Sequence, residues 1–384
     1  MDQLHFSSFM LFLKGVPDPR KARGQRYAWW FLLAVICIGI VGKQLSGRAI
    51  AHWSALHAEA IRDYLRIKLS RMPSESTVRR VLHHVDIKAL ERQVAAFSAQ
   101  VDGEQFEGWC TMGRDGEVLR GQAVDGKEVR GASAHGVKTH LVSCVRHGSG
   151  IVPGQCKVDE KTNEIRAVPE LLAELDLTGT VTTFDALHTQ RHIAQQIIDQ
   201  GGDYLMVVKR NQLTLYEDLE TLFSAEGFSA EKGTDIYRYV NKGHGRLERR
   251  TLICSTLLNR FLDWPGIAQV MQRRCQRLLL KKQIPSDEVT YGITSVLPDR
   301  AGAKEMEAFW RGHWTVENVD HYVRDETLKE DRCQIRKGNA PQAFAALKNG
   351  LLTLLRAHGW NNIADALRYY GAFVCKALLL IGIC

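Results

Sequence analysis

The sequence of 384 residues lacks the features that most readily define a class of protein. Its nine cysteines are an odd number without a C-x-x-C pair. This argues against structural zinc and a disulfide framework, and is typical of reduced thiols in the cytoplasm. No apolar run reaches the roughly 20 residues of a membrane-spanning helix. The one candidate, Ala28–Gly42, has about 15 residues and predicts a buried helix, while the closing segment Phe373–Cys384 contains Lys376 and predicts a docking helix. Repeats and low-complexity tracts are also missing, so we expect a cytoplasmic globular protein without a membrane span.

The composition, with 45% hydrophobic and 24% charged residues, is that of a soluble globular protein. At about 150 residues per domain, the chain is long enough for two or three domains. Lys and Arg number 51 against 43 Asp and Glu, and the net charge of +8 favours a polyanionic partner. Positive charge is concentrated in residues 14–48, where Asp18 is the only acid, and in residues 246–282, which include Arg249 and Arg250. Each cluster suits contact with phosphates, and the alternative is a solvated charged face.

The pattern of residues changes along the chain and divides it into four segments. Residues 1–105 are expected to be helical, and a helix starting near Ser74 carries Arg79 and Arg80 on its polar face, as a recognition helix would. Residues 106–212 show short β-type runs in hairpin order followed by alternating helix and strand, which predicts an α/β domain with a mixed sheet. Residues 213–300 predict a β-rich insertion. Residues 301–384 are again helical, beginning with a long amphipathic helix over Glu305–Val323.

Two of the predicted strands end in an isolated aspartate. Asp125 and Asp185 each follow an apolar run and precede a small residue. A carboxylate at a buried strand end is costly unless its charge is compensated. Two convergent carboxylates are a minimal platform for Mg²⁺, which binds a few carboxylates together with waters and phosphate oxygens. The alternative is that each aspartate caps a turn or a helix.

A third acidic residue, Glu317, lies among aromatic residues in the predicted C-terminal helix. His313, Trp314 and His321 are three or four residues from Glu317 and therefore share its helix face. The alternative is a surface face beside a buried tryptophan. The two histidines are eight residues apart rather than four, so a two-histidine zinc helix is not indicated.

Six segments occur in one order that resembles a known family. They are GQAVDGKEVRG (residues 121–131), KVDEKTNEIRAVPELL (157–172), TTFDALHTQ (182–190), GGDYLMVVKRNQ (201–212), HGRLERR (244–250) and RGHWTVENVDHYVRDETLKEDRCQIRKGNAPQAFAALKNGLL (311–352). Together with residues 16–35 and 71–82, they resemble the DDE transposases of bacterial insertion sequences, in the branch that includes the H-repeat-associated proteins of Rhs elements.

The resemblance implies an RNase H-like catalytic domain in which Asp125, Asp185 and Glu317 hold two Mg²⁺ ions, with Mn²⁺ as a substitute. Asp125 matches the first family aspartate in a DGK context that includes Lys127, Asp185 matches the second, and Glu317 matches the glutamate of an HW-x-(I/V)-EN context. The resemblance further implies cleavage of double-stranded DNA at element ends and strand transfer into target DNA. It also implies DNA-end binding by residues 1–105, a homodimer in the DNA complex and a nucleoid-associated location.

The surroundings of the glutamate depart from the wider superfamily, which often has a tyrosine seven residues before it, an arginine four before it and a lysine seven after it. Trp310, His313 and Arg324 stand at these positions. Arg324 keeps a permanent charge that suits a phosphate, whereas His313 is a weaker substitute for arginine. Trp314 lies where relatives stack a tryptophan on a flipped base, and a core tryptophan is the alternative. A catalytically inactive DNA-binding derivative stays possible, and the same metal site would serve a nuclease without strand transfer.

Overall fold

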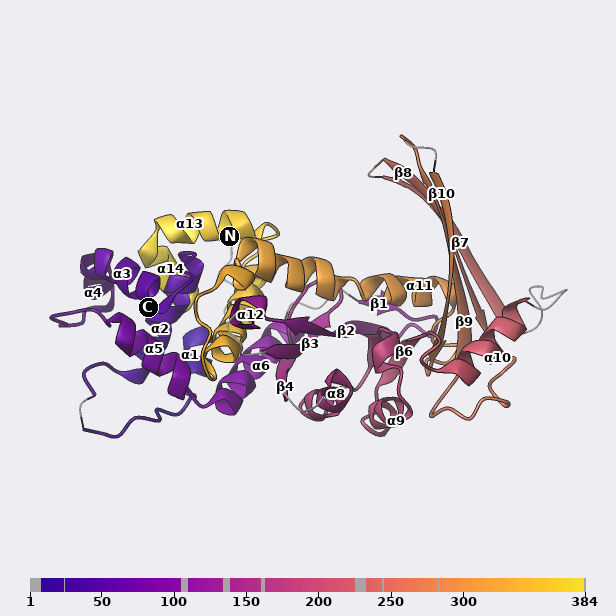
Figure 1. Cartoon of the computed structure of the whole chain (residues 1–384), viewed down its shortest axis with the longest axis horizontal. Coiled ribbons are helices and arrows are strands. Elements are labelled where there is room, and N and C mark those ends of the chain that lie inside the picture. Colours follow the sequence, from indigo (N-terminus) through magenta and orange to yellow (C-terminus); the bar gives the residue numbers. More distant parts are fainter. Residues whose placement is uncertain are drawn as a thin grey trace.

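The computed structural model of the chain describes residues 8–23, 25–104, 110–133, 139–159, 163–224, 233–243, 245–281 and 284–382. The molecule is elongated, with a helical part at one end, a sheet through the middle and long strands that project at the other end (Figure 1). The two ends of the described chain meet in the helical part, where Ser8 Oγ donates a hydrogen bond to the Ile381 carbonyl at 3.2 Å.

The N-terminal segment is helical, as predicted. Its helices are α1 (Phe9–Lys14), α2 (Trp29–Val41), α3 (Gly47–Leu56), α4 (Ala58–Leu65), α5 (Glu75–His84) and α6 (Ile87–Glu104). Helix α2 is the apolar run of the sequence, and it is buried on nearly every side. Helix α3 begins after Ser46, whose Oγ accepts a hydrogen bond from the Ala49 N–H at 3.0 Å.

The C-terminal helices α12 (Ala340–Ala357), α13 (Ile363–Ala372) and α14 (Val374–Leu380) complete the same core. Phe9, Ile36 and Leu347 are all fully buried in it, although they come from opposite ends of the chain. A buried side chain of this size contributes about 1.5–3 kcal/mol, so the two ends of the chain stabilise each other. Helix α14 packs into this core, as predicted for the closing segment. In the described part of the chain, every helix is too short or too polar to cross a membrane.

A mixed sheet forms the middle of the molecule. Its strands are β1 (Thr111–Met112), β2 (Val118–Glu128), β3 (His140–Arg146), β4 (Gly154–Val158), β5 (Thr180–Phe184) and β6 (Asp203–Val208). The order is β4-β3-β2-β5-β6, with β1 paired to β2 outside this path. Strand β3 pairs antiparallel with both β2 and β4, whereas β5 pairs parallel with both β2 and β6. Three antiparallel strands followed by two parallel ones confirm the predicted RNase H-like sheet.

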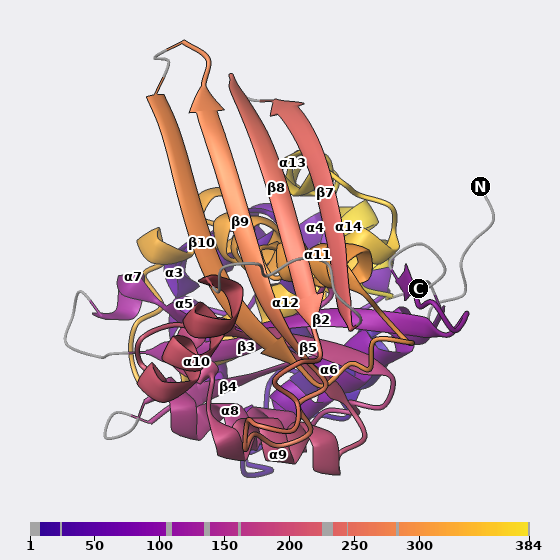
Figure 2. The ribbon, with the colours of Figure 1, turned by 90° about the vertical axis from the view of Figure 1, so that its right-hand side faces the viewer.

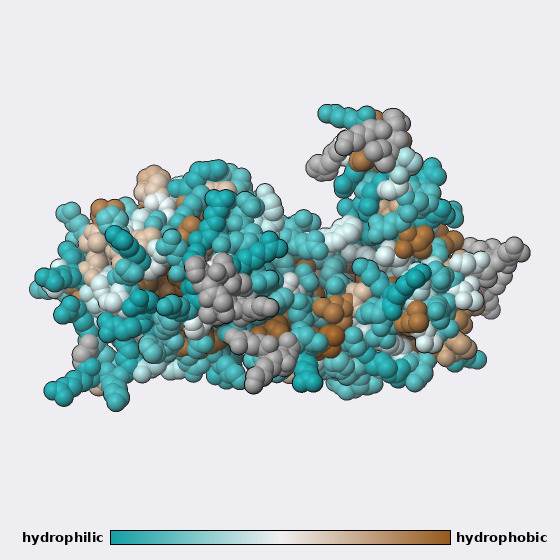
Figure 3. Space-filling model, in the orientation of Figure 1, coloured by the Kyte–Doolittle hydropathy of each residue, from teal (hydrophilic) through white to brown (hydrophobic). Residues whose placement is uncertain are grey.

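The predicted β-rich insertion is confirmed as an extension of this sheet. Strands β7 (Thr234–Gly243), β8 (Arg246–Ser255), β9 (Gln269–Leu279) and β10 (Ile284–Thr294) are antiparallel and join the sheet where β10 pairs with β6. Their far ends project from the body (Figure 2) and are mostly hydrophilic on the face shown in Figure 3. Helix α10 (Leu213–Ser224), which the sequence analysis did not predict, precedes them and buries Leu215, Leu219 and Phe223.

Helices cover both faces of the sheet (Figure 1). Helices α8 (Glu164–Ala173) and α9 (Arg191–Asp199) lie on one face, and α11 (Ala303–Gly312) lies on the other. The short α7 (Arg130–Ser133) follows β2. The predicted long helix over Glu305–Val323 is not regular throughout, because α11 gives way to the π-helical segments η3 (Val316–His321) and η4 (Val323–Thr327), followed by η5 (Glu330–Arg332). Such wide turns are rare and occur frequently at functional sites.

Candidate catalytic site

Asp125 and Asp185 lie side by side at one edge of the sheet. Asp185 directly follows β5, as predicted, whereas the predicted strand end is wrong for Asp125, because β2 continues to Glu128. Strands β2 and β5 are parallel neighbours, and their register pairs Val124 with Phe184, so the next residue on each chain segment is an aspartate. The side chain of Asp125 is 24% exposed and that of Asp185 is 48% exposed. The structure therefore brings together two of the three predicted carboxylates at a position that solvent reaches.

Negative charge is crowded at this edge. Burial raises the pKa of Asp125 to about 6, and the nearby carboxylates of Asp185 and Glu164 add to that shift. A divalent cation bound here would favour the ionised carboxylate. The donor set thus fits a hard metal ion, which prefers carboxylate oxygens.

Asp185 also caps a short helix, which was the alternative to metal binding, but only one of its two carboxylate oxygens is used for this. Oδ1 accepts hydrogen bonds from the backbone N–H groups of Leu187 at 3.0 Å and His188 at 3.4 Å, at the start of the short helix η2 (Ala186–His188). Among the described residues, none forms a hydrogen bond or an ion pair with Oδ2. Asp185 therefore caps a turn and still presents an oxygen to a cation.

Glu317 lies on η3, in a segment that packs across the ends of the aspartate-bearing strands. Four residues before it, His313 Nδ1 lies 3.0 Å from Thr183 Oγ1, and four residues after it, His321 Nδ1 lies 3.7 Å from Asp125 Oδ2. The side chain of Glu317 is exposed. In the part of the chain that the structure describes, no group of three or more His, Cys, Asp and Glu residues is arranged to hold a metal ion. The segment that carries Glu317 therefore lies close to Asp125 and Asp185, while the Glu317 carboxylate itself is exposed to solvent.

Sequence reasoning missed a further acidic residue at this edge, Glu164. Glu164 is the first residue of α8, and its Oε1 lies 2.7 Å from His140 Nε2, while its Oε2 lies 3.1 Å from His188 Nε2. His188 is completely buried and also places Nδ1 3.1 Å from Asp185 Oδ1. Glu164 and His188 both occur in segments that carry the family resemblance, but their spacing along the chain gives neither a role.

The contacts of His188 with Asp185 and Glu164 join oppositely charged groups. Although burial opposes the charged forms, Asp185 and Glu164 raise the pKa of His188 to about 9, and His140 and His188 lower the pKa of Glu164 to about 2. At neutral pH, His188 is therefore an imidazolium between two carboxylates. Neither of its ring nitrogens is aligned for a hydrogen bond, so the attraction is that of ions in contact.

Arg324 does not face this site. It is completely buried, with Nε donating a hydrogen bond to Glu330 Oε2 at 2.9 Å and Nη1 lying 3.5 Å from Asp320 Oδ2. Two buried acids require a cation beside them, because unpaired buried charge is strongly unfavourable. The structure contradicts the expected phosphate contact of Arg324, which instead neutralises the interior beneath η4.

Lys127 and Arg250 are also buried in ion pairs rather than presented to DNA. Lys127 Nζ lies 2.5 Å from Asp325 Oδ1, which joins β2 to η4. Arg250 pairs with Glu248 on the same strand and donates a hydrogen bond to the Tyr239 hydroxyl at 3.0 Å. The structure therefore contradicts their expected contacts with DNA, since each charge is already compensated inside the protein.

His313 and Trp314 lie close to the strand ends but are constrained by protein contacts. Burial lowers the pKa of His313 to about 4, so it is neutral at physiological pH and offers no charge to a phosphate. Trp314 is half-buried, with the guanidinium carbon of Arg273 5.4 Å from its ring centroid. Arg273 in turn pairs with Glu307 at 2.8 Å. Stacking of Trp314 on a base stays a prediction.

Three of the predicted DNA-contacting residues are exposed. Arg79 and Arg80 lie on the outer face of α5, where Arg80 Nε donates a hydrogen bond to the Ser76 carbonyl at 3.1 Å, and Arg249 lies on β8. These side chains are accessible to a phosphate, and their contact with DNA stays a prediction.

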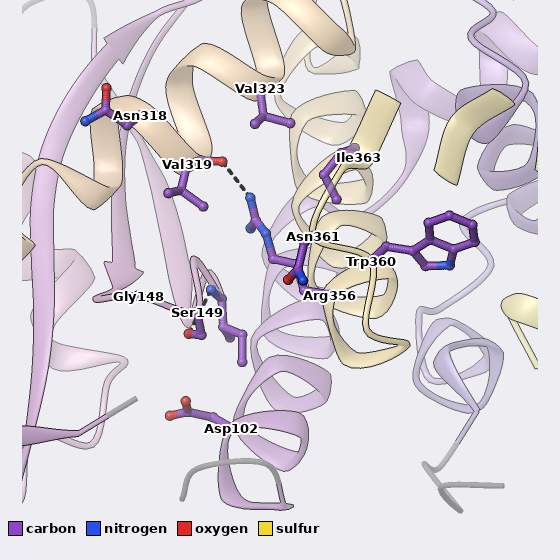
Figure 4. A pocket seen from close by; sticks show the side chains of 11 residues that line it. Asp102, Gly148, Ser149, Asn318, Val319, Val323, Arg356, Trp360, Asn361 and Ile363 are labelled. Carbon is purple, nitrogen blue, oxygen red and sulfur yellow. Dashed lines mark hydrogen bonds between the residues drawn. The ribbon is translucent and has the colours of Figure 1, made fainter. Parts of the chain in front are cut away.

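A cavity of about 280 Å³ lies beside η3 (Figure 4). It is lined by Asn318 and Val319 from η3, by Ser149 from the turn between β3 and β4, and by Arg356 from α12. Arg356 Nη2 donates a hydrogen bond to the Val319 carbonyl at 2.5 Å, which is drawn in Figure 4. This contact ties the segment that carries Glu317 to the helical core.

Comparison with known proteins identifies the class of protein. A profile described as transposase DDE domain matches residues 116–354, and a profile described as DDE_Tnp_1-associated matches residues 10–98. The chain belongs to the DDE transposase family, which generally uses divalent metal ions.

Its relatives include bacterial proteins named as transposases. The chain is 35% identical over 293 residues to the putative transposase YncI of Escherichia coli O157:H7, covering 74% of this chain and 71% of that protein. It is 32% identical over 336 residues to the H repeat-associated putative transposase YhhI of Escherichia coli K12, covering 84% and 83%. Among solved structures, a piggyBac transposase synaptic complex with hairpin DNA is similar over 92% of this chain and 73% of that chain, with a TM-score of 0.44 and 10% identity.

Proposed function

We propose that the protein binds the ends of an insertion sequence in double-stranded DNA and catalyses Mg²⁺-dependent cleavage and strand transfer into target DNA. The observation that carries this proposal is the adjacency of Asp125 and Asp185 at an edge of the RNase H-like sheet, beneath the segment that carries Glu317. Membership of the DDE transposase family supports it.

Asp125, Asp185 and Glu317 are the residues that would hold two Mg²⁺ ions, with Mn²⁺ as a substitute. Asp185 offers Oδ2, Asp125 offers a carboxylate whose charged form is disfavoured by burial and by neighbouring negative charge, and Glu317 offers an exposed carboxylate. When bound, the ions activate water or a DNA 3′-hydroxyl and stabilise the leaving oxygen. Because Glu317 is open to solvent, we expect it to complete the site when metal and DNA are both present.

The exposed arginines identify candidate DNA surfaces. We propose that Arg79 and Arg80 on α5 contact the phosphates of an element end, in keeping with a DNA-end binding role for residues 1–105. Arg249 on β8 would make a further backbone contact from the projecting strands. By analogy with the family, we propose that two copies of the chain pair two element ends as a homodimer in the DNA complex.

The test uses a duplex that carries the inverted repeat flanking the reading frame in its genome. Asp125→Asn, Asp185→Asn and Glu317→Gln should each abolish Mg²⁺-dependent cleavage while leaving DNA affinity unchanged. Asp199→Asn, an exposed aspartate on α9, is the matched control and should cut like the wild type. A variant of the three that cut at the normal rate would refute its assignment.

One observation favours a second candidate, a catalytically inactive DNA-binding derivative. At the two positions around Glu317 where the family pattern has cations, this chain has His313, which is neutral, and Arg324, which is buried. Wild-type protein that binds the duplex but neither binds Mn²⁺ nor cuts would establish that candidate. Cutting without joining of the 3′-hydroxyl end to target DNA would instead indicate a nuclease.

A further inference from the structure

We propose that His188 and Glu164 form a positioning pair that holds the carboxylate of Asp185 by its Oδ1, with Oδ2 turned toward the metal ions. This inference rests on the proposed function, because it assigns a role at the same site. The family motif of three carboxylates includes neither residue.

His188 is built into the fold beside Asp185. It ends the short helix η2 that Asp185 caps, and it is completely buried. Its ring lies between two carboxylates, with Nδ1 3.1 Å from Asp185 Oδ1 and Nε2 3.1 Å from Glu164 Oε2. Both nitrogens are therefore engaged by the protein, so His188 has none left to offer a metal ion.

Glu164 is anchored in turn. Its Oε1 lies 2.7 Å from His140 Nε2 on β3, so both of its oxygens contact histidines. Its carboxylate packs directly over Gly126, the residue after Asp125, where an added Cβ would lie 2.3 Å from it. The absence of a side chain at Gly126 is what allows Glu164 to approach Asp125 and still reach His188. Glu164 is thus fixed from two sides, which suits a positioning residue better than a ligand that must move.

The consequence is a fixed orientation for Asp185. Its Oδ1 accepts two hydrogen bonds, from the backbone N–H groups of Leu187 and His188, and lies in ion-pair contact with the ring of His188. A carboxylate held by one oxygen cannot rotate freely and presents the other oxygen in a single direction. Outer partners of this kind commonly change metal affinity or activity by about 10–100-fold when they are removed.

The test measures metal affinity directly. Binding of Mn²⁺ to the full-length protein is followed by the electron paramagnetic resonance signal of free Mn²⁺. We expect His188→Ala and Glu164→Gln each to weaken Mn²⁺ binding by about 10–100-fold. His192→Ala, which removes an exposed histidine from α9, is the matched control and should bind Mn²⁺ like the wild type.

Cleavage of the inverted-repeat duplex gives a second readout that general destabilisation would not produce. The Mn²⁺ concentration for half-maximal cleavage should rise by the same factor as the dissociation constant, and cleavage should recover at saturating Mn²⁺. Asp185→Asn, which removes the ligand itself, should not recover. His188→Asn, which keeps a donor near Asp185 but cannot reach Glu164, should lie between wild type and His188→Ala.

The outcomes separate this inference from the proposed function. Wild-type protein that binds Mn²⁺ and cuts, together with His188→Ala and Glu164→Gln variants of unchanged Mn²⁺ affinity, would overturn the positioning pair and leave the function intact. Wild-type protein without Mn²⁺ binding or cleavage would overturn both. If His188→Ala does not fold, the near-isosteric Glu164→Gln decides the question alone.

Discussion

Replacement of Arg324 by methionine distinguishes a structural cation from a phosphate contact. Arg324 is completely buried, with Nε 2.9 Å and Nη2 2.8 Å from Glu330 Oε2, and Nη1 3.5 Å from Asp320 Oδ2. Methionine fills much of the same volume but leaves Asp320 without this cation and Glu330 with Lys348 alone. Removal of one partner from a buried pair costs about 3–5 kcal/mol. We expect the free energy of unfolding of Arg324→Met to fall by that amount.

The assay is urea unfolding followed by circular dichroism, with DNA affinity measured on the folded protein. Arg79→Met is the control, because the exposed Arg79 should change stability by less than about 0.5 kcal/mol. Folded Arg324→Met should bind the inverted-repeat duplex as tightly as the wild type. An Arg324→Met variant with the wild-type unfolding midpoint and weakened DNA binding would refute the structural role and restore the phosphate contact.

Two further predictions concern a partly buried acid and the outer face of α5. Glu91 accepts hydrogen bonds from Gln155 and Gln342, each at 2.9 Å, and burial raises its pKa to about 7. Since the folded protein binds this proton more tightly than the unfolded chain, wild-type stability should fall as pH rises from about 4.5 to 7. Glu91→Gln should gain up to roughly 3 kcal/mol relative to the wild type over that window in urea unfolding, and a constant difference would refute the assignment. The double variant Arg79→Ala/Arg80→Ala should reduce the slope of log affinity for DNA against log salt by about 2 without lowering the melting temperature, and an unchanged slope would remove α5 from the DNA interface.

The fold could be predicted from sequence wherever a local pattern was strong. Asp125 and Asp185 each follow an apolar run, which marks them as charges that need a partner, although only Asp185 directly follows the end of its strand. The β-rich insertion and the buried α2 follow from periodicity and hydrophobic length. Helix α10 was missed, because its buried positions are few and stand among acidic and polar residues.

The surroundings of the site could not be predicted in this way, because they depend on contacts between distant segments. Glu164 contacts His188 only when β2 and β5 pair and α8 packs against them. The spacing of the two residues along the sequence does not predict this contact. Arg324 was assigned to a phosphate from its position seven residues after Glu317, where the superfamily often has a lysine. The π-helical turns of η3 and η4 change the rotation of the chain after Gly312, and Asp320 and Glu330 then hold the guanidinium inside.

Diffraction from crystals of the DNA-bound protein soaked in Mn²⁺ tests most directly whether Asp125, Asp185 and Glu317 act on one phosphodiester. The anomalous signal should place manganese between the carboxylates of Asp125 and Asp185, with Oδ2 of Asp185 as a ligand and the Glu317 side chain turned in to join them. Manganese bound elsewhere, or a Glu317 carboxylate still directed into solvent beside a filled and DNA-loaded site, would contradict the account.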